Sequence, residues 1–261
     1  MPQRTSYKHG EFSWVDLNAH DMDAAGKFYG DLFGWKTVMM DTQGGPPYAQ
    51  FEQGDLVIGG LGQMSDEMKA QGIPPLWNNY VNVDDAEATA SKAQQLGGQV
   101  IVPVMQVMDA GWLAYLQDPT GAVFAIWQKN HSAGATIRNE PNAFGWNELA
   151  TRDIEAAKTF YGELFGWEFE ENTMSPAKYY ICNVDGENAG GLMEMTEEWG
   201  EIPPHWSVYF CVADATATAN KLTELGGTVR VPPFDTHVGQ IAILADAQGA
   251  GFNIIQLKEP A

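Results

Sequence analysis

The chain is poor in basic residues and in long apolar segments. Lysine and arginine number 14 against 34 aspartates and glutamates in 261 residues, which gives a net charge of −20. This excess of negative charge repels phosphate backbones and anionic membrane surfaces, so we expect neither nucleic acid nor a membrane as a partner. No stretch approaches the roughly 18 apolar residues of a membrane helix, and the start has no signal-peptide pattern. We therefore expect a cytoplasmic protein.

Residues that commonly hold metals are also scarce. Cys182 and Cys211 are the only cysteines, they lie outside any CxxC pattern, and we expect both to be buried. The five histidines show neither HxH nor HxxxH spacing. We expect His20, His131 and His205 to lie at the surface rather than to bind a metal.

The chain does contain a clear internal duplication. The segment FYGDLFGW at 28–35 returns as FYGELFGW at 160–167, and 13 of 24 positions are identical between 12–35 and 144–167. Apolar residues make up 44% of the chain, enough for a sizeable core. The sequence predicts two modules, 1–130 and 142–261, joined by a polar linker near 129–143.

A fainter repeat divides each module again. The residues Asp21, Ala24, Leu32 and Gly34 recur with the same spacing from Asp85, from Asp153 and from Asp214. The Asp is typical of a helix start and the Gly of a helix end. Apolar residues spaced four apart form one apolar stripe along the helix between them. Apolar or alternating runs precede and follow each helix and predict strands. We therefore expect an α+β fold of four βαβββ units, paired into two modules, each a curled mixed sheet enclosing a cleft with helices outside.

This pattern resembles the vicinal oxygen chelate superfamily, which includes glyoxalases, bleomycin-resistance proteins and extradiol dioxygenases. The resemblance rests on the βαβββ units, on FYGDLFGW, on DPTGAVF at 118–124, and on the openings WVDL at 14–17 and WNEL at 146–149. It implies a cleft in which His and Glu side chains hold a divalent ion that chelates the substrate.

The ligand positions implied by the resemblance carry unsuitable residues here. The first ligand lies seven residues before each Asp, and another follows DPxG on the last strand. Those positions hold Trp14, Asn78, Trp146, Ser207, Ala125 and Asn253. None is a His or a carboxylate, so we expect no cofactor and disfavour a divalent metal. Glu194, where some relatives carry a metal-binding Glu, is a weak metal candidate that could pair with Glu148.

The same cleft-facing strands offer carboxylates instead. Alternation along a strand places Asp16, Tyr80, Glu148 and Tyr209 on the face that carries the vacant ligand positions. A carboxylate among aromatic rings has a raised pKa and can act as a general acid or base, so Asp16 and Glu148 are the catalytic candidates. The structural alternative is that both carboxylates accept hydrogen bonds and brace the sheet.

Three functions remain in competition. The first is a metal-independent lyase or isomerase that binds a small organic molecule in a cleft lined by Trp and Tyr, with acid–base chemistry at Glu148 or Asp16. The second is a non-catalytic protein that sequesters such a molecule. The third is a metal-dependent glyoxalase or dioxygenase with an atypical site. The expected ligand-binding residues are Trp14, Trp146, Tyr80, Tyr209, Asn78 and Asn253. The sequence leaves a monomer and a homodimer equally open.

Overall fold

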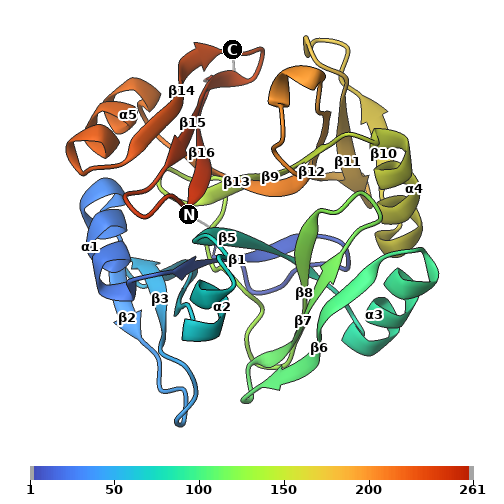
Figure 1. Cartoon of the computed structure of the whole chain (residues 1–261), viewed down its shortest axis with the longest axis horizontal. Helices are drawn as coiled ribbons and strands as arrows, with labels where there is room; N and C mark the ends of the chain where they lie inside the picture. Colours follow the sequence, from blue (N-terminus) through green and yellow to red (C-terminus); the bar gives the residue numbers. More distant parts are fainter. Residues whose placement is uncertain (1–2, 259–261) are drawn as a thin grey trace.

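The computed structural model describes residues 3–258 and contains two curled, eight-stranded mixed sheets. Each sheet is built from two βαβββ units, so the fold predicted from the fourfold repeat is confirmed (Figure 1). We refer to the first sheet with its helices as module A and to the second as module B. No helix among residues 3–258 is both long and apolar enough to cross a membrane.

Module A contains eight strands and three helices. Its elements are β1 (Phe12–Ala19), α1 (Met22–Phe33), β2 (Lys36–Met39), β3 (Tyr48–Gln53), β4 (Leu56–Gln63), α2 (Asp66–Ala70), β5 (Leu76–Asn82), α3 (Ala86–Gln95), β6 (Gln99–Val107), β7 (Gly111–Gln117) and β8 (Val123–Lys129).

Module B repeats this order, with a short 3₁₀ helix in the place of α2. Its elements are β9 (Phe144–Thr151), α4 (Ile154–Phe165), β10 (Glu168–Glu171), β11 (Tyr179–Val184), β12 (Glu187–Glu194), η1 (Glu197–Trp199), β13 (His205–Cys211), α5 (Ala215–Glu224), β14 (Thr228–Asp235), β15 (Gly239–Ala245) and β16 (Gly251–Leu257).

The opening strands of the units meet at the centre of each sheet. The strand order is β2-β3-β4-β1-β5-β8-β7-β6 in module A and β10-β11-β12-β9-β13-β16-β15-β14 in module B. The central pairs β1·β5 and β9·β13 are antiparallel, whereas β1·β4, β5·β8, β9·β12 and β13·β16 are parallel. The edge strands β2 and β6, or β10 and β14, are therefore the two ends of each curled sheet.

The four long helices begin as the sequence predicts. In each unit the Asp before the helix accepts a hydrogen bond from the main-chain N–H three residues later, for example Asp153 Oδ1 from Ala156 at 2.9 Å. The helices α1 and α4 end at Gly34 and Gly166, which adopt the left-handed conformation.

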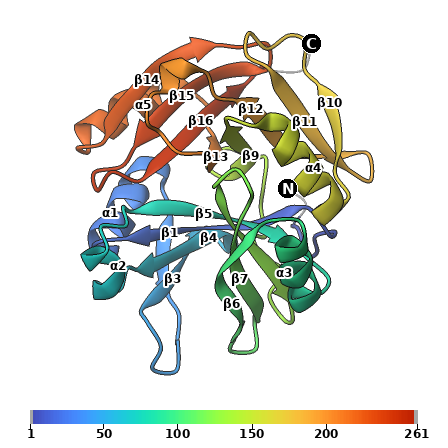
Figure 2. The same ribbon diagram turned by 45° about the vertical axis from the view of Figure 1, so that its right-hand side comes forward.

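The two modules pack with their helix-bearing faces together. One buried core joins α1 and β1 of module A to α5 and β16 of module B, and a second joins α3 of module A to α4 of module B. Figures 1 and 2 show α1 beside α5 on one side and α3 beside α4 on the other, with β5 next to β13 between them. The opposite, concave faces therefore point away from each other.

The repeated FYG(D/E)LFGW segment contacts the other module. Tyr29 on α1 donates to Asp246 Oδ2 in module B at 3.1 Å and accepts from Trp77 Nε1 at 2.9 Å. Its counterpart Tyr161 on α4 donates to Asp118 in module A at 2.8 Å, within the DPTG turn. The segment thus recurs because each copy joins its helix to a turn of the partner module.

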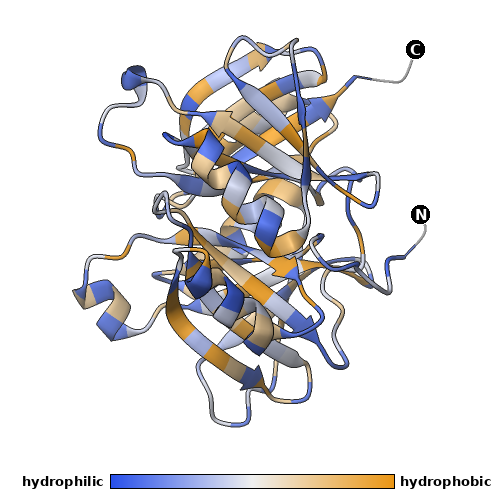
Figure 3. Cartoon of the chain, turned by 90° about the vertical axis from the view of Figure 1, so that its right-hand side faces the viewer, coloured by the Kyte–Doolittle hydropathy of each residue, from blue (hydrophilic) through white to orange (hydrophobic). Residues whose placement is uncertain are grey.

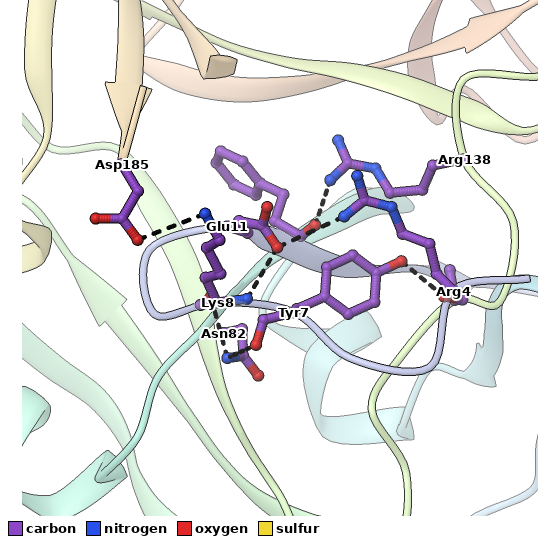
Figure 4. Close-up of polar contacts among 9 residues, drawn as sticks. Arg4, Tyr7, Lys8, Glu11, Asn82, Arg138 and Asp185 are labelled. Carbon is purple, nitrogen blue, oxygen red and sulfur yellow. Dashed lines mark hydrogen bonds and ion pairs between the residues drawn. The ribbon is translucent and has the colours of Figure 1, made fainter. Parts of the chain in front are cut away.

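The N-terminal segment and the linker close the seam between the modules (Figure 4). Tyr7 Oη donates to the Ala135 carbonyl at 2.6 Å, and Arg138 Nη1 donates to the Phe12 carbonyl at 2.6 Å. Lys8 lies 3.6 Å from Asp185 of module B. Ala135 and Ile137 are buried in the first core. The segment expected to be a polar linker is therefore a packed part of the interface, because its few apolar residues face inward.

Candidate functional site

Alternation along the central strands separates a helix face from a concave face. Val15 and Leu17 of β1 are buried in a core shared with the helices, whereas Trp14 and Asp16 point to the other side. The strands of module B divide in the same way, and Figure 3 shows the resulting mixture of apolar and polar residues along the strands. The concave faces therefore carry the predicted site residues.

In module A, Asp16 lies at the centre of a hydrogen-bonded cluster and is 6% exposed. Its Oδ1 accepts from Asn78 Nδ2 at 2.8 Å, and its Oδ2 accepts from the hydroxyls of Tyr80 at 3.0 Å and Tyr48 at 3.1 Å. Tyr115 lies 2.6 Å from the Tyr80 hydroxyl and donates to it, since the proton of Tyr80 is directed at Asp16. Burial raises the pKa of Asp16, and the three hydrogen bonds oppose this rise.

In module B, Glu148 takes the place of Asp16 and is 8% exposed. Its Oε1 accepts from the Tyr209 hydroxyl at 2.8 Å. The Tyr179 hydroxyl accepts from Trp146 Nε1 at 2.9 Å, and Tyr179 also acts on the pKa of this carboxyl. Burial raises the pKa of Glu148, and the two tyrosines partly oppose that rise. Fewer donors hold Glu148 than hold Asp16, so more of its acceptor capacity is free.

Two glycines make room for the tyrosines of these clusters. A Cβ atom on Gly60 would lie 1.9 Å from the Tyr48 hydroxyl, and a Cβ on Gly191 would lie 1.9 Å from the Tyr179 hydroxyl. Gly60 pairs with Asp16, and Gly191 pairs with Glu148. Each tyrosine therefore crosses the glycine to reach the carboxyl group.

Around the central carboxyl groups, three equivalent positions carry different side chains in the two modules. Asn78 in module A corresponds to Ser207 in module B, because both pair with the central carboxylate. Ala125 corresponds to Asn253, because they pair with Tyr80 and Tyr209. Tyr115, which extends the cluster of module A, corresponds to Ile243. Module B consequently has the simpler polar cluster and the more apolar wall.

The residues on the concave faces do not fit a divalent metal ion. Each face has one carboxylate at its centre, hydrogen-bonded by tyrosine, with Trp, Asn, Ser or Ala at the positions where the resemblance implied metal ligands. Within residues 3–258, no three His, Cys, Asp or Glu side chains gather in a way that could hold an ion. The expectation that the chain carries no metal stays a prediction.

Glu194 is not brought to Glu148. It is the counterpart of Gln63, as expected, because the two residues pair with Thr151 and Ala19. Leu192, two residues earlier on β12, is buried on the helix face, so Glu194 points to that face as well. Its carboxylate is 40% exposed and lies 4.0 Å from Lys178 Nζ. The expectation that Glu194 and Glu148 could form a pair of carboxylates is wrong, because their side chains lie on opposite faces of the sheet.

Sequence reasoning missed Tyr48, Tyr179 and Tyr115. Tyr48 and Tyr179 occupy equivalent places on β3 and β11, each two positions from the residue that pairs with the central glycine. Their recurrence in both modules was a usable signal. Their direction depends on the register of β3 and β11, which no local pattern specifies.

A family model described as the Glyoxalase/Bleomycin resistance protein/Dioxygenase superfamily matches the chain twice, over residues 11–126 and 143–254. The chain is 37% identical over 259 residues to the putative glyoxylase CFP32 of Mycobacterium tuberculosis, covering 98% of each chain. It is 32% identical over 265 residues to the anthracycline biosynthesis protein DnrV of Streptomyces peucetius, covering 98% of this chain and 96% of DnrV.

Solved structures share the fold at low sequence identity. The Mn(II)-bound glyoxalase from Novosphingobium aromaticivorans superimposes with a TM-score of 0.64 at 14% identity, over 97% of this chain and 84% of that protein. The dioxygenase LapB from Pseudomonas superimposes with a TM-score of 0.66 at 13% identity, over 98% of this chain and 96% of LapB.

Proposed function

Since the chain belongs to the glyoxalase, bleomycin resistance protein and dioxygenase superfamily, we propose that it binds a small organic molecule on the concave face of module B, where Glu148 transfers protons without a metal. The observation that carries this proposal is the incompletely hydrogen-bonded Glu148, buried between Tyr209 and Tyr179. A carboxylate in this setting is a stronger base than one in water.

The proposed chemistry is a lyase or isomerase step that begins with proton transfer. Glu148 accepts a proton from a C–H next to a carbonyl group, or from an O–H of the bound molecule, and returns it to a neighbouring atom. Tyr209 holds the carboxylate in place at 2.8 Å and stabilises its charged form. Trp146 positions Tyr179 at 2.9 Å.

Module A is better suited to binding than to catalysis. Both oxygens of Asp16 accept hydrogen bonds, from Asn78, Tyr80 and Tyr48, so a substrate would have to displace a protein donor to reach this base. This arrangement favours a second role in which module A holds a small molecule without changing it. The relative DnrV acts in anthracycline biosynthesis, so hydroxylated polycyclic compounds are suitable first candidates.

Hydrogen–deuterium exchange tests the proton transfer without knowledge of the product. Hydroxylated aromatic and α-hydroxycarbonyl compounds are incubated with the protein in D₂O and followed by proton NMR. We expect exchange at one carbon position that Glu148→Gln abolishes and that Asp16→Asn leaves near the wild-type rate. EDTA should have no effect.

Other results would point elsewhere. A ligand that quenches tryptophan fluorescence and returns without exchange would identify a sequestration protein. Exchange that requires added Mn²⁺ and disappears with EDTA would identify the metal-dependent alternative. Equal exchange rates in wild type and Glu148→Gln would remove Glu148 from the mechanism.

A further inference from the structure

The concave face of module B carries an exposed aromatic ring on its edge strand. Phe234 lies on the edge strand β14, pairs with Ile241, and is 42% exposed. Ile241 packs with Tyr209 and Trp146, so Phe234 points to the same concave face. The equivalent residue of module A is Met105, which pairs with Leu113 and is 50% exposed. Both modules thus keep a large, partly exposed apolar side chain at this position.

Most of the wall between Phe234 and Glu148 is aliphatic. The concave-face residues of β11, β15 and β16 include Ile181, Ile241, Ile243, Ile255 and Leu257. Leu257 is the counterpart of Lys129 in module A, because both pair with the first glycine of the preceding strand. A flat apolar body can remove this surface from water, which favours its binding.

Two further glutamates lie on this face. Glu168 and Glu170 on β10 share the face of Ile181, and the equivalent positions in module A hold Lys36 and Val38. Arg230 is a basic side chain that also reaches this face, because a Cβ atom on Gly251, which shares the face of Asn253, would lie 3.3 Å from its Nη1.

The basic side chains at the margins of the sheet have other partners. Arg230 donates to the Gly249 carbonyl at 3.2 Å, and Lys258 donates to the Thr236 carbonyl at 2.7 Å. His205 donates through Nδ1 to the Pro203 carbonyl at 2.8 Å. An anionic ligand would therefore meet three carboxylates and one guanidinium, and that guanidinium already donates to a carbonyl.

Resting on the function proposed above, we propose that module B selects a flat, apolar molecule that carries no negative charge and presents an O–H group to Glu148, with Phe234 as a specificity-determining contact. Glu148 can only accept hydrogen bonds in its charged form, so the ligand supplies the donor. Phe234 covers the apolar body of the ligand from the edge of the sheet. Anionic conjugates of the same ring system are disfavoured, because the three carboxylates of Glu148, Glu168 and Glu170 outnumber the single guanidinium of Arg230.

The first test compares two probes that differ in charge. Binding of quinizarin, a neutral dihydroxyanthraquinone, and of its sulfonate to the full chain is followed by quenching of tryptophan fluorescence at pH 7. We expect quinizarin to bind at least about tenfold more tightly than the sulfonate. Equal or tighter binding of the sulfonate, or no binding of either probe, would overturn the proposal.

Matched variants locate the binding. Phe234→Ala should weaken quinizarin binding by about tenfold, whereas Met105→Ala in module A should change it less than about twofold. Glu170→Lys should tighten sulfonate binding at low salt. Glu171→Lys makes the same change of charge, but its residue pairs with Tyr180 on the helix face, so it should have little effect. A larger effect from Met105→Ala, or equal effects of the two lysine variants, contradicts the assignment to module B.

The outcome separates this inference from the proposed function. Quinizarin binding that depends on Phe234 but shows no Glu148-dependent exchange for any ligand supports the ligand class and removes the acid–base chemistry. Glu148-dependent exchange on an anionic compound supports the chemistry and removes the ligand class.

Discussion

At the residue scale, the two central carboxyl groups are held in different ways. Asp16 is held by three side-chain donors, whereas Glu148 accepts one short hydrogen bond, from Tyr209. The longer glutamate side chain and the loss of the Asn78 equivalent leave Glu148 with free acceptor capacity in a buried place. This difference makes module B the better candidate for chemistry, although the two modules share a common plan.

The raised pKa of Glu148 makes stability depend on pH in a defined direction. Burial raises the pKa above its ordinary value of 4.5, so the folded state prefers the protonated form. This contribution to stability is complete below pH 4.5 and is lost as the pH rises through the raised value. Glu148→Gln has no carboxyl group to ionise at this position, so it does not lose this stability as the pH rises. We expect its melting temperature, relative to wild type, to increase as the pH rises from about 4 to 7.

Differential scanning calorimetry of both proteins over this range measures the effect. Comparing the two proteins at each pH cancels the general repulsion of a chain with net charge −20. A difference that stays constant with pH, or that moves in the opposite direction, would show that burial does not dominate at Glu148.

At the scale of elements, the helix starts were readily predictable and the strand registers were not. The Asp of each unit, the spacing of four and the closing Gly of α1 and α4 are local signals, and each has a local cause in helix capping and amphipathic packing. The position of Tyr179 over Gly191 arises from the pairing of β11 with β12, which involves residues distant in sequence. The face of Glu194 was misjudged for the same reason.

Removing one helix cap should cost a modest amount of stability. Asp153→Ala leaves the Ala156 N–H of α4 without its side-chain acceptor, and we expect the free energy of unfolding to fall by about 1 kcal/mol. Asp153→Asn keeps an acceptor oxygen and should stay close to wild type. Urea unfolding followed by circular dichroism measures both variants. If Asp153→Asn loses as much as Asp153→Ala, the charge near the helix start matters more than the hydrogen bond.

At the scale of the whole molecule, the cores do not follow the division into modules. The first core contains α1 with α5, and the second contains α3 with α4, so each core draws on both halves of the chain. The sequence predicted the duplication and the units, but it suggested a polar linker where Ala135 and Ile137 are buried. The contact between units from different modules carries no local signature, because the same aromatic residues would serve a core within one module.

The tyrosine of each repeated segment should contribute to joining the modules. Tyr161→Phe removes the donor to Asp118 and the acceptor of Trp206 Nε1, both at 2.8 Å, and leaves two buried polar groups with fewer partners. We expect a loss of about 1–3 kcal/mol in the free energy of unfolding.

Two further variants serve as controls for this prediction. Tyr29→Phe removes the equivalent contacts of α1 and should have a similar effect. Tyr180→Phe should be nearly neutral, because the Tyr180 hydroxyl makes no hydrogen bond within residues 3–258 and its ring keeps Lys158 at 3.9 Å. Guanidinium unfolding measures all three. A loss at Tyr180 as large as that at Tyr161 would mean that the effect is not specific to the contact between modules.

The arrangement with helix faces inward and concave faces outward has a consequence for how such a duplicated chain diverges. A substitution in either core affects the packing of both modules, so the core residues of the two modules are constrained together. The concave faces share no side chains, and a change such as Tyr115 against Ile243 alters one without touching the other. One module can therefore acquire a new ligand specificity during evolution while the other module retains the ancestral one.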